Sequence, residues 1–100
     1  MFCSGQLSIS VEDEIPETAE AQTELCFLNV AAILEAAGMS LKDIVRINAY
    51  VTDRAHLPGY MKVRDRLFAD PAPASTLMIV SGFAREAFKV EIEVIAAAPE

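Results

Sequence analysis

Two acidic residues near the end of the chain are the side chains best suited to chemistry. Glu91 and Glu93 are two positions apart in an alternating stretch, so on a β-strand both would project from the same face. Two carboxylates can perform acid–base catalysis when their surroundings push their pKa values apart. They could equally be two solvated charges, or partners for arginines of a neighbouring subunit. The spacing alone leaves all three interpretations open.

Other reactive residue types give weaker signals. Ser4-Gly5-Gln6 places a glycine between two polar residues, where a ligand or another chain could approach the backbone closely. His56 is the only histidine, and because no nucleophile is fixed near it, a catalytic triad is not supported and a surface position is expected. Cys3 and Cys26 lack metal-ligand spacing, which predicts buried free thiols and no metal site. No phosphate-binding or dinucleotide-binding glycine motif occurs, so no cofactor is expected.

Composition limits the partners and the location. The chain has 100 residues, 15 acidic and 8 basic, with a net charge of −7. One domain over residues 1–100 is expected, and the acidic balance argues against nucleic acid and against a membrane surface. Without a signal peptide or a membrane-spanning apolar run, a cytoplasmic location is expected. Hydrophobic residues reach 53%, which indicates either an apolar surface that meets another subunit or an alanine-rich core.

The residue pattern predicts an α+β fold in the order strand, helix, strand, helix, strand, strand. The expected strands are 2–9, 43–53, 75–82 and 88–97, and the expected helices are 18–37 and 57–68. A strand that follows a helix implies a crossover, so we expect a mixed β-sheet with both helices on one face. The last two strands are expected to pair as a hairpin.

The two faces of this sheet should differ. In the strand at 43–53 the residues expected to share one face are Val45, Ile47, Ala49 and Val51. The helix-free face would carry Arg46, Asn48, Tyr50, Glu91 and Glu93. Such a face is either a solvated surface or a subunit interface at which polar groups converge on a site. The small size and the apolar excess favour the interface.

Several segments taken together resemble the RidA/YjgF/YER057c family, also called endoribonuclease L-PSP. They are Ser4-Gly5-Gln6, Gln22, Asn29-Val30, Ala36-Ala37-Gly38, the strand from Ile44 to Asp53, Pro73-Ala74 and Val90-Glu91-Ile92-Glu93. The series follows the family's order and spacing over essentially the whole chain. The resemblance implies a chorismate-mutase-like fold and a homotrimer with a small-molecule cleft at each subunit interface. It also implies hydrolysis of imines and enamines without cofactor or metal.

The family's site residues carry over only in part. The resemblance makes Glu91 the catalytic residue, which orients water or handles a proton, and makes Ser4 and Gly5 ligand-binding residues. The family's substrate-binding arginine falls on Ser75, and we expect Ser75 and Thr76 to be ligand-binding residues of an interface cleft. Ser4 and Glu91 would complete this cluster. A serine cannot replace the bidentate contact of a guanidinium with a carboxylate. The resemblance therefore implies a subgroup that lacks the catalytic arginine and has weak or no 2-iminoacid deaminase activity.

Several alternatives stay open. Arg64 or Arg46, from this chain or a neighbouring subunit, could supply the absent cation, although Arg64 could equally be a solvated helix residue. The protein could also be a non-catalytic ligand-binding or regulatory trimer, or a structural partner of an enzyme. The family's strand before Ser4 has no counterpart here, which suggests that an upstream strand is missing from this chain.

Overall fold

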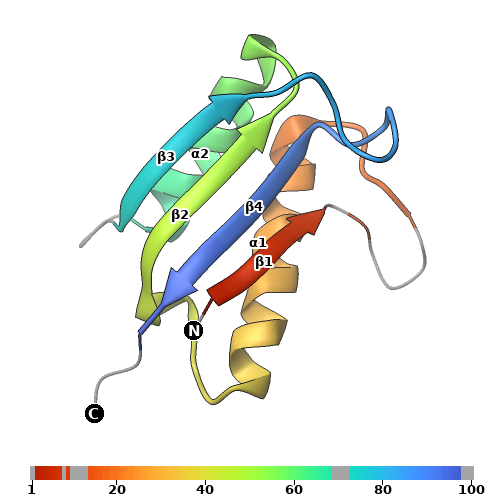
Figure 1. Ribbon diagram of the computed structural model, residues 1–100. Coiled ribbons are helices and arrows are strands. Elements are labelled where there is room, and N and C mark those ends of the chain that lie inside the picture. Colours follow the sequence, from red (N-terminus) through yellow and green to blue (C-terminus); the bar gives the residue numbers. More distant parts are fainter. Residues whose placement is uncertain (1, 8, 10–13, 69–72, 98–100) are drawn as a thin grey trace.

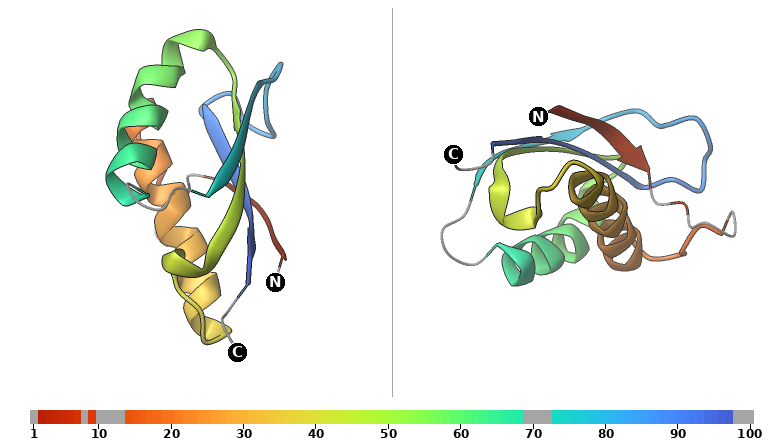
Figure 2. Two further views of the ribbon diagram at one scale, coloured as in Figure 1. Left: turned by 90° about the vertical axis from the view of Figure 1, so that its left-hand side faces the viewer. Right: turned by 90° about the horizontal axis from the view of Figure 1, so that it is seen from below.

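Four strands form one mixed sheet, and two helices cover one of its faces (Figures 1 and 2). In this computed structural model the described residues are 2–7, 9, 14–68 and 73–97, with Ser4 described by its backbone alone. The strand order is β1-β4-β2-β3, and β4 runs antiparallel to both of its neighbours. The strands are β1 (Phe2–Leu7), β2 (Ile44–Val51), β3 (Ala74–Ile79) and β4 (Val90–Ala96). The predicted α+β class with both helices on one face is confirmed.

The predicted hairpin between the last two strands is wrong. β3 pairs in parallel with β2, with Ile47 opposite Ser75, while β4 lies at the centre of the sheet between β1 and β2. The chain reaches β3 through helix α2 (Leu57–Leu67). A crossover through a helix brings the next strand back parallel to the previous one. The other edge of β2 is therefore left for β4.

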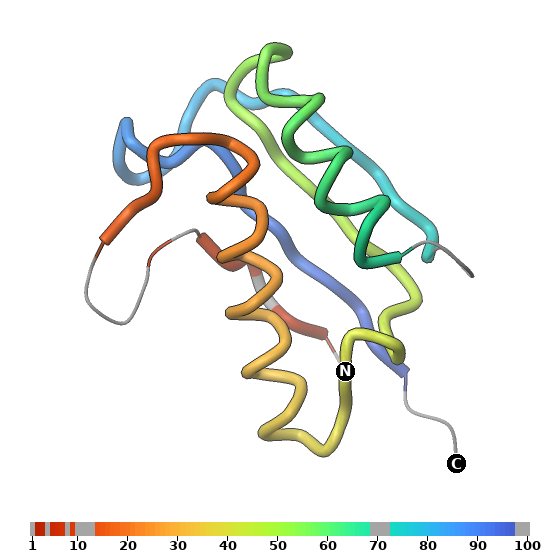
Figure 3. Tube along the Cα trace, turned by 180° about the vertical axis from the view of Figure 1, so that it is seen from behind, coloured from red at the N-terminus to blue at the C-terminus, as the bar shows by residue number. Residues whose placement is uncertain are grey.

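The two helices begin and end as their sequences indicate. In α1 (Ala19–Ala36) the Thr18 hydroxyl accepts a hydrogen bond from the Ala21 amide at 3.1 Å. Just beyond its C-terminal end Gly38 has a φ of 76°, which favours glycine. A Cβ on Gly59 would lie 2.9 Å from the backbone nitrogen of Glu20, so the N-terminal turns of the two helices are in close contact. Figure 3 shows both helices in front of the sheet. Among the described residues no helix is long and apolar enough to cross a membrane.

The core lies between the helices and the sheet. In the last strand Glu91 and Glu93 were expected on the helix-free face, and the residues that alternate with them, Phe88, Val90, Ile92, Val94 and Ala96, are accordingly all buried. Both cysteines are buried, as expected, and neither forms a disulfide among the described residues.

One part of the alternation predicted for β2 is wrong. Val45 is 49% exposed, and Ile44 is buried instead. The pairing of β2 with β4 is irregular between Ile44 and Arg46. A bulge adds a residue to one strand and so shifts which side chains face the core. From Ile47 onward the expected alternation holds.

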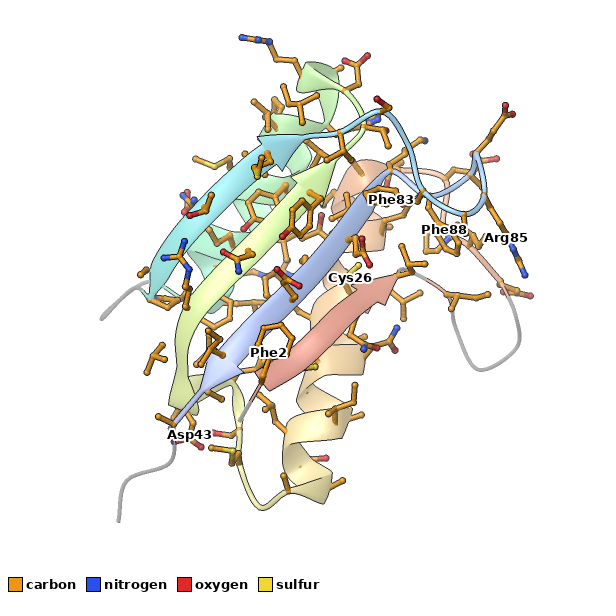
Figure 4. All side chains as sticks on the ribbon, viewed as in Figure 1. Phe2, Cys26, Asp43, Phe83, Arg85 and Phe88 are labelled. Atoms are coloured by element: carbon orange, nitrogen blue, oxygen red, sulfur yellow. The ribbon has the colours of Figure 1, made fainter. Side chains whose placement is uncertain are left out.

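The other face of the sheet carries polar groups at its centre and apolar groups toward its edges. The polar side chains are the ones predicted there: Arg46, Asn48, Tyr50, Glu91 and Glu93. Phe2 and Met78 are more than half exposed, and Ile95 is also exposed. In Figure 4 Phe2 lies over this face, which we call the open face.

Candidate functional site

On the open face the side chain of Glu91 in β4 closely approaches Gly5 of β1. The pairing of these strands is irregular between Cys3 and Gln6, which places Gly5 in the irregularity. A Cβ on Gly5 would lie 2.2 Å from Oε1 of Glu91 and 2.8 Å from its carboxyl carbon. No other residue type would leave this carboxylate where it is. The glycine was expected to admit a ligand or another chain, whereas the group that approaches it within this chain is the side chain of Glu91.

The carboxylates of Glu91 and Glu93 have different surroundings. Glu93 accepts a hydrogen bond from the Tyr50 hydroxyl at 2.7 Å and another from the Asn48 amide at 3.2 Å. The pKa of Tyr50 is raised by its hydrogen bond to Glu93, by the burial of its hydroxyl and by the charges of both glutamates. The carboxylate of Glu91 has no hydrogen bond or ion pair with any described residue. Its burial, and secondly the charge of Glu93, raise the pKa of Glu91.

Glu91 lines a hollow of about 360 Å³ on the open face. The lining residues are Gly5, Tyr50, Val80, Gly82, Phe83, Glu91 and Glu93. Figure 4 labels Phe83 in the loop that leads from β3 to β4, near the start of β4. A space of this size suits a small metabolite. The sequence analysis missed the contribution of this loop, because an aromatic residue beside a glycine does not by itself indicate a binding wall.

Two polar residues of α1, one buried and one half-buried, hold the walls of this hollow in place. Gln22 is fully buried, donates to the Ala87 carbonyl at 2.8 Å and accepts from the Lys89 amide at 2.7 Å. Asn29 donates to the Leu7 carbonyl at 3.0 Å. Gln22 thus fixes the entry to β4, and Asn29 fixes the end of β1. Both belong to the segments that carry the family resemblance, and here both are structural.

The structure does not bring Ser75 and Thr76 to Glu91 within one chain. Ser75 is opposite Ile47, whose buried side chain faces the helices, so Ser75 lies on the helix side of the sheet. Thr76 is on the open face and accepts a hydrogen bond from Arg46. The predicted cluster of Ser4, Ser75, Thr76 and Glu91 is therefore divided between two faces, and the side chain of Ser4 lies outside the described residues.

Ser75 instead meets Arg64, one of the two arginines considered as sources of the absent cation. Ser75 and Arg64 line a second hollow of about 220 Å³, together with Asp65, Phe68 and Pro73. The Nη2 of Arg64 lies 2.9 Å from Oδ1 of Asp65, and its guanidinium carbon lies 5.9 Å from the centre of the Tyr60 ring. Arg64 is therefore held against the helix surface and is not freely solvated. We call this second hollow the α2–β3 pocket.

No metal centre is evident in the described part of the chain, where no three histidine, cysteine, aspartate or glutamate side chains come together. His56 follows Asp53 in a short helical turn and contacts neither hollow. Both hollows are therefore built from hydroxyl, carboxylate, guanidinium and aromatic groups.

Known proteins give a consistent picture of the family. The sequence profile described as endoribonuclease L-PSP matches residues 1–98. Protein mmf2, mitochondrial, from Schizosaccharomyces pombe is 34% identical over 99 residues, which cover 97% of this chain and 79% of that protein. A 2-iminobutanoate/2-iminopropanoate deaminase from Dermatophagoides farinae is 29% identical over 97 residues, covering 95% and 75% of the two chains. The crystal structure of RidA from Psychrobacter sp. superposes with a TM-score of 0.90 at 36% identity, covering 97% and 79%. The chorismate-mutase-like fold is thereby confirmed, and the chain belongs to the endoribonuclease L-PSP family, also known as RidA/YjgF/YER057c.

Proposed function

We propose that this protein binds a small metabolite at a subunit interface and hydrolyses an imine-like or enamine-like bond through Glu91. The main observation behind this proposal is the environment of the Glu91 carboxylate. Its carboxylate lines a hollow, lacks a hydrogen-bond partner among the described residues, and has a pKa raised by burial and by Glu93. A carboxyl group with a raised pKa is a stronger base and a usable acid near neutral pH. The Dermatophagoides relative, named as an imine deaminase, supports this reaction class.

The reaction requires no group other than Glu91 and water. Glu91 takes one proton from water while the oxygen adds to the C=N carbon, and returns that proton to the nitrogen, which gives a neutral carbinolamine. Glu91 then takes the hydroxyl proton of the carbinolamine and passes it to the nitrogen as the carbon–nitrogen bond breaks. The products are a carbonyl compound and ammonia, and Glu91 ends as the carboxylate it was at the start. One carboxyl group therefore serves as base and then as acid, and no cofactor or metal takes part in the proposed reaction.

We further propose a homotrimer. β3 lies at an edge of the sheet, and Met78 and Ile79 on it are 53% and 49% exposed. An open strand edge with exposed apolar residues favours pairing or packing with another chain. Since Glu91 and Ser75 lie on opposite faces of one sheet, only a second copy could place the two in one cleft. A family-type trimer meets both requirements.

Activity on 2-imino acids should be weak. The family's carboxylate-binding arginine corresponds to Ser75, and a hydroxyl cannot make the bidentate contact of a guanidinium. We expect less acidic substrates. A ribonuclease activity is not proposed, because a net charge of −7 opposes binding of a phosphate backbone. A cytoplasmic location also remains a proposal, since mmf2 carries a mitochondrial label.

The deciding assay uses 2-iminopropanoate generated in situ by a serine dehydratase. The parent protein should be slow and Ser75→Arg faster, because the variant restores the guanidinium to the scaffold. Adding Glu91→Gln to Ser75→Arg should abolish the gain. Equal turnover with and without Glu91 would remove the proposed mechanism. Sedimentation as a stable monomer at micromolar concentration would remove the trimer.

A second candidate is a non-catalytic ligand-binding or regulatory trimer. The observation in its favour is that Oε1 of Glu91 packs against the backbone of Gly5, as a purely structural carboxylate would. Calorimetric binding of a metabolite without turnover would favour this alternative.

A further inference from the structure

The α2–β3 pocket contains a cation that is already neutralised. Both Nε and Nη2 of Arg64 donate to the same oxygen of Asp65, at 3.2 Å and 2.9 Å. The Arg64 side chain is 26% exposed, so it stays at the pocket, while that of Asp65 is 66% exposed. The remaining N–H groups of Arg64 and the second oxygen of Asp65 are not used in these bonds. The pocket therefore offers donors and an acceptor together, with no net charge.

A hydroxyl behind this pocket has no partner. Tyr60 is fully buried, and its hydroxyl makes no hydrogen bond of acceptable geometry with any described residue. The Ser75 hydroxyl is its close neighbour: burial raises the pKa of Tyr60, while Ser75 and then Arg64 act in the opposite direction. The two hydroxyls are near each other but short of a formed hydrogen bond. An unsatisfied buried hydroxyl is costly, so a group that completes this arrangement is favoured.

The charge balance decides which ligand group fits. A carboxylate would compete with Asp65 for the same guanidinium and would give the pocket a net negative charge. A neutral carboxamide would not compete. Its carbonyl oxygen can accept from Arg64 and from the Ser75 hydroxyl, and its NH₂ group can donate to Asp65. If Ser75 donates outward, its oxygen remains free to accept from Tyr60, which gives the buried hydroxyl its partner.

We propose that the α2–β3 pocket selects a neutral carboxamide over a carboxylate, with Asp65 as the specificity-determining residue and Tyr60 as a positioning residue. As a statement about the substrate, this rests on the proposed function, because the pocket meets Glu91 only through a second copy. As a statement about binding, it holds without turnover. The walls of Phe68 and Pro73 suit a short aliphatic chain beside the amide.

The test uses propionamide and propionate, which have the same shape and differ in charge. Binding is followed by NMR through the backbone amide signals of Phe68 and Ser75, so the position of the ligand is measured together with its affinity. Propionamide should shift these signals, and propionate should bind more weakly. Equal or tighter binding of propionate, or no shift with either compound, would overturn the proposal.

Substitutions of Asp65 and Arg64 test the role of each residue. Asp65→Asn frees the guanidinium, so it should reverse the preference by raising propionate affinity about fivefold, which is the value of an exposed ion pair. Arg64→Gln should abolish binding of both compounds. The matched control is Arg66→Gln on the same helix, which removes an equal charge but one paired with Glu24 outside this pocket. Binding that falls equally in both arginine variants would show a general charge effect and overturn the assignment.

Two further readouts separate this proposal from the catalytic one. Tyr60→Phe should lower propionamide affinity and leave the amide-to-acid preference unchanged, because it acts through Ser75; an unchanged affinity would remove Tyr60 from the arrangement. Glu91→Gln should leave propionamide binding intact. If Glu91 proves dispensable for turnover while Asp65→Asn still reverses the preference, the proposed reaction fails and the pocket assignment stands.

Discussion

Replacing Gly5 by alanine should displace the Glu91 carboxylate while leaving the fold stable, so the effect of the carboxylate's position can be measured on its own. The new Cβ would lie 2.2 Å from Oε1 and 3.2 Å from Cγ of Glu91, whereas ordinary contact begins near 3.4 Å. The carboxylate must therefore retreat by about an ångström. Because the atoms that clash belong to the end of a side chain, the backbone need not move.

The free-energy terms of this substitution predict a large loss of activity with little change in stability. An off-rotamer Glu91 costs about 0.5–1.5 kcal/mol. Replacing glycine by alanine gives back about 0.4–1 kcal/mol by restricting the unfolded chain. The free energy of unfolding should thus change by less than about 1 kcal/mol, a shift of a few degrees in Tm. Displacing a catalytic group by an ångström, by contrast, can reduce the rate about 100-fold.

The assay measures kcat/KM on 2-iminopropanoate in the Ser75→Arg background, together with thermal unfolding. The matched control is Gly59→Ala, whose Cβ would lie 2.9 Å from the backbone nitrogen of Glu20. Backbone cannot give way as a side-chain end can, so this variant should lose about 1–3 kcal/mol of stability and keep the activity of its folded fraction. Unchanged kcat/KM in Gly5→Ala would refute the reasoning, and so would a loss that merely follows unfolding.

Four other perturbations test the surroundings of the site. Glu93→Gln removes a charge that raises the pKa of Glu91, so the acid limb of the pH profile of kcat/KM should move to lower pH. Glu91→Gln tests the raised pKa of Glu91, because a raised pKa means that the folded protein favours the protonated carboxyl group. The stability that Glu91 contributes, measured against Glu91→Gln, should be fully present below its ordinary pKa of 4.5 and should be lost as the pH rises through the raised pKa. Parallel curves of Tm against pH for the two proteins would contradict this. Gln22→Ala leaves buried backbone groups without partners and should cost about 3 kcal/mol in denaturant unfolding, with a matching loss of order in the loop before β4. Tyr60→Phe deletes a buried hydroxyl that has no partner, so stability should be unchanged or rise by about 1 kcal/mol, and a large loss would reveal a hidden partner.

Local patterns in the sequence predicted the elements and most of their faces. Alternation over β4 placed Glu91 and Glu93 together opposite the core, and this is how they lie. The period of two is a property of the strand itself, so no partner need be known. The same argument failed at Val45, because a bulge is a property of a pair of strands and leaves no mark in the alternation of one.

Relations between distant elements could not be predicted in this way. The position of β4 beside β2 depends on which edge the crossover to β3 leaves free. The side on which Ser75 lies depends on its register with Ile47. The sequence does not indicate that the Tyr60 hydroxyl lacks a hydrogen-bond partner, because a tyrosine at a helical spacing predicts only an apolar core residue. Family resemblance predicted Ser75 as a site residue, and Arg64 was only one of two candidates for the absent cation; that Arg64 lines a pocket with Ser75 follows from the packing of α2 on β3.

The positions of the two hollows bear on the proposed homotrimer. Glu91, the proposed acid–base group, lies on β4 at the open face, and the α2–β3 pocket lies between the edge strand and α2 on the other side. A ligand held by one cannot reach the other through the sheet of the same chain. If copies pack with the open face of one against the β3 edge of the next, a single ligand can contact Glu91 of the first and Asp65 of the second. Mixing Glu91→Gln chains with Arg64→Gln chains, whose pocket should not bind ligand, would then generate cleft types that neither parent has, including one that retains both Glu91 and Arg64. Recovery of turnover on mixing would require that arrangement, and additive behaviour of the two parents would exclude it.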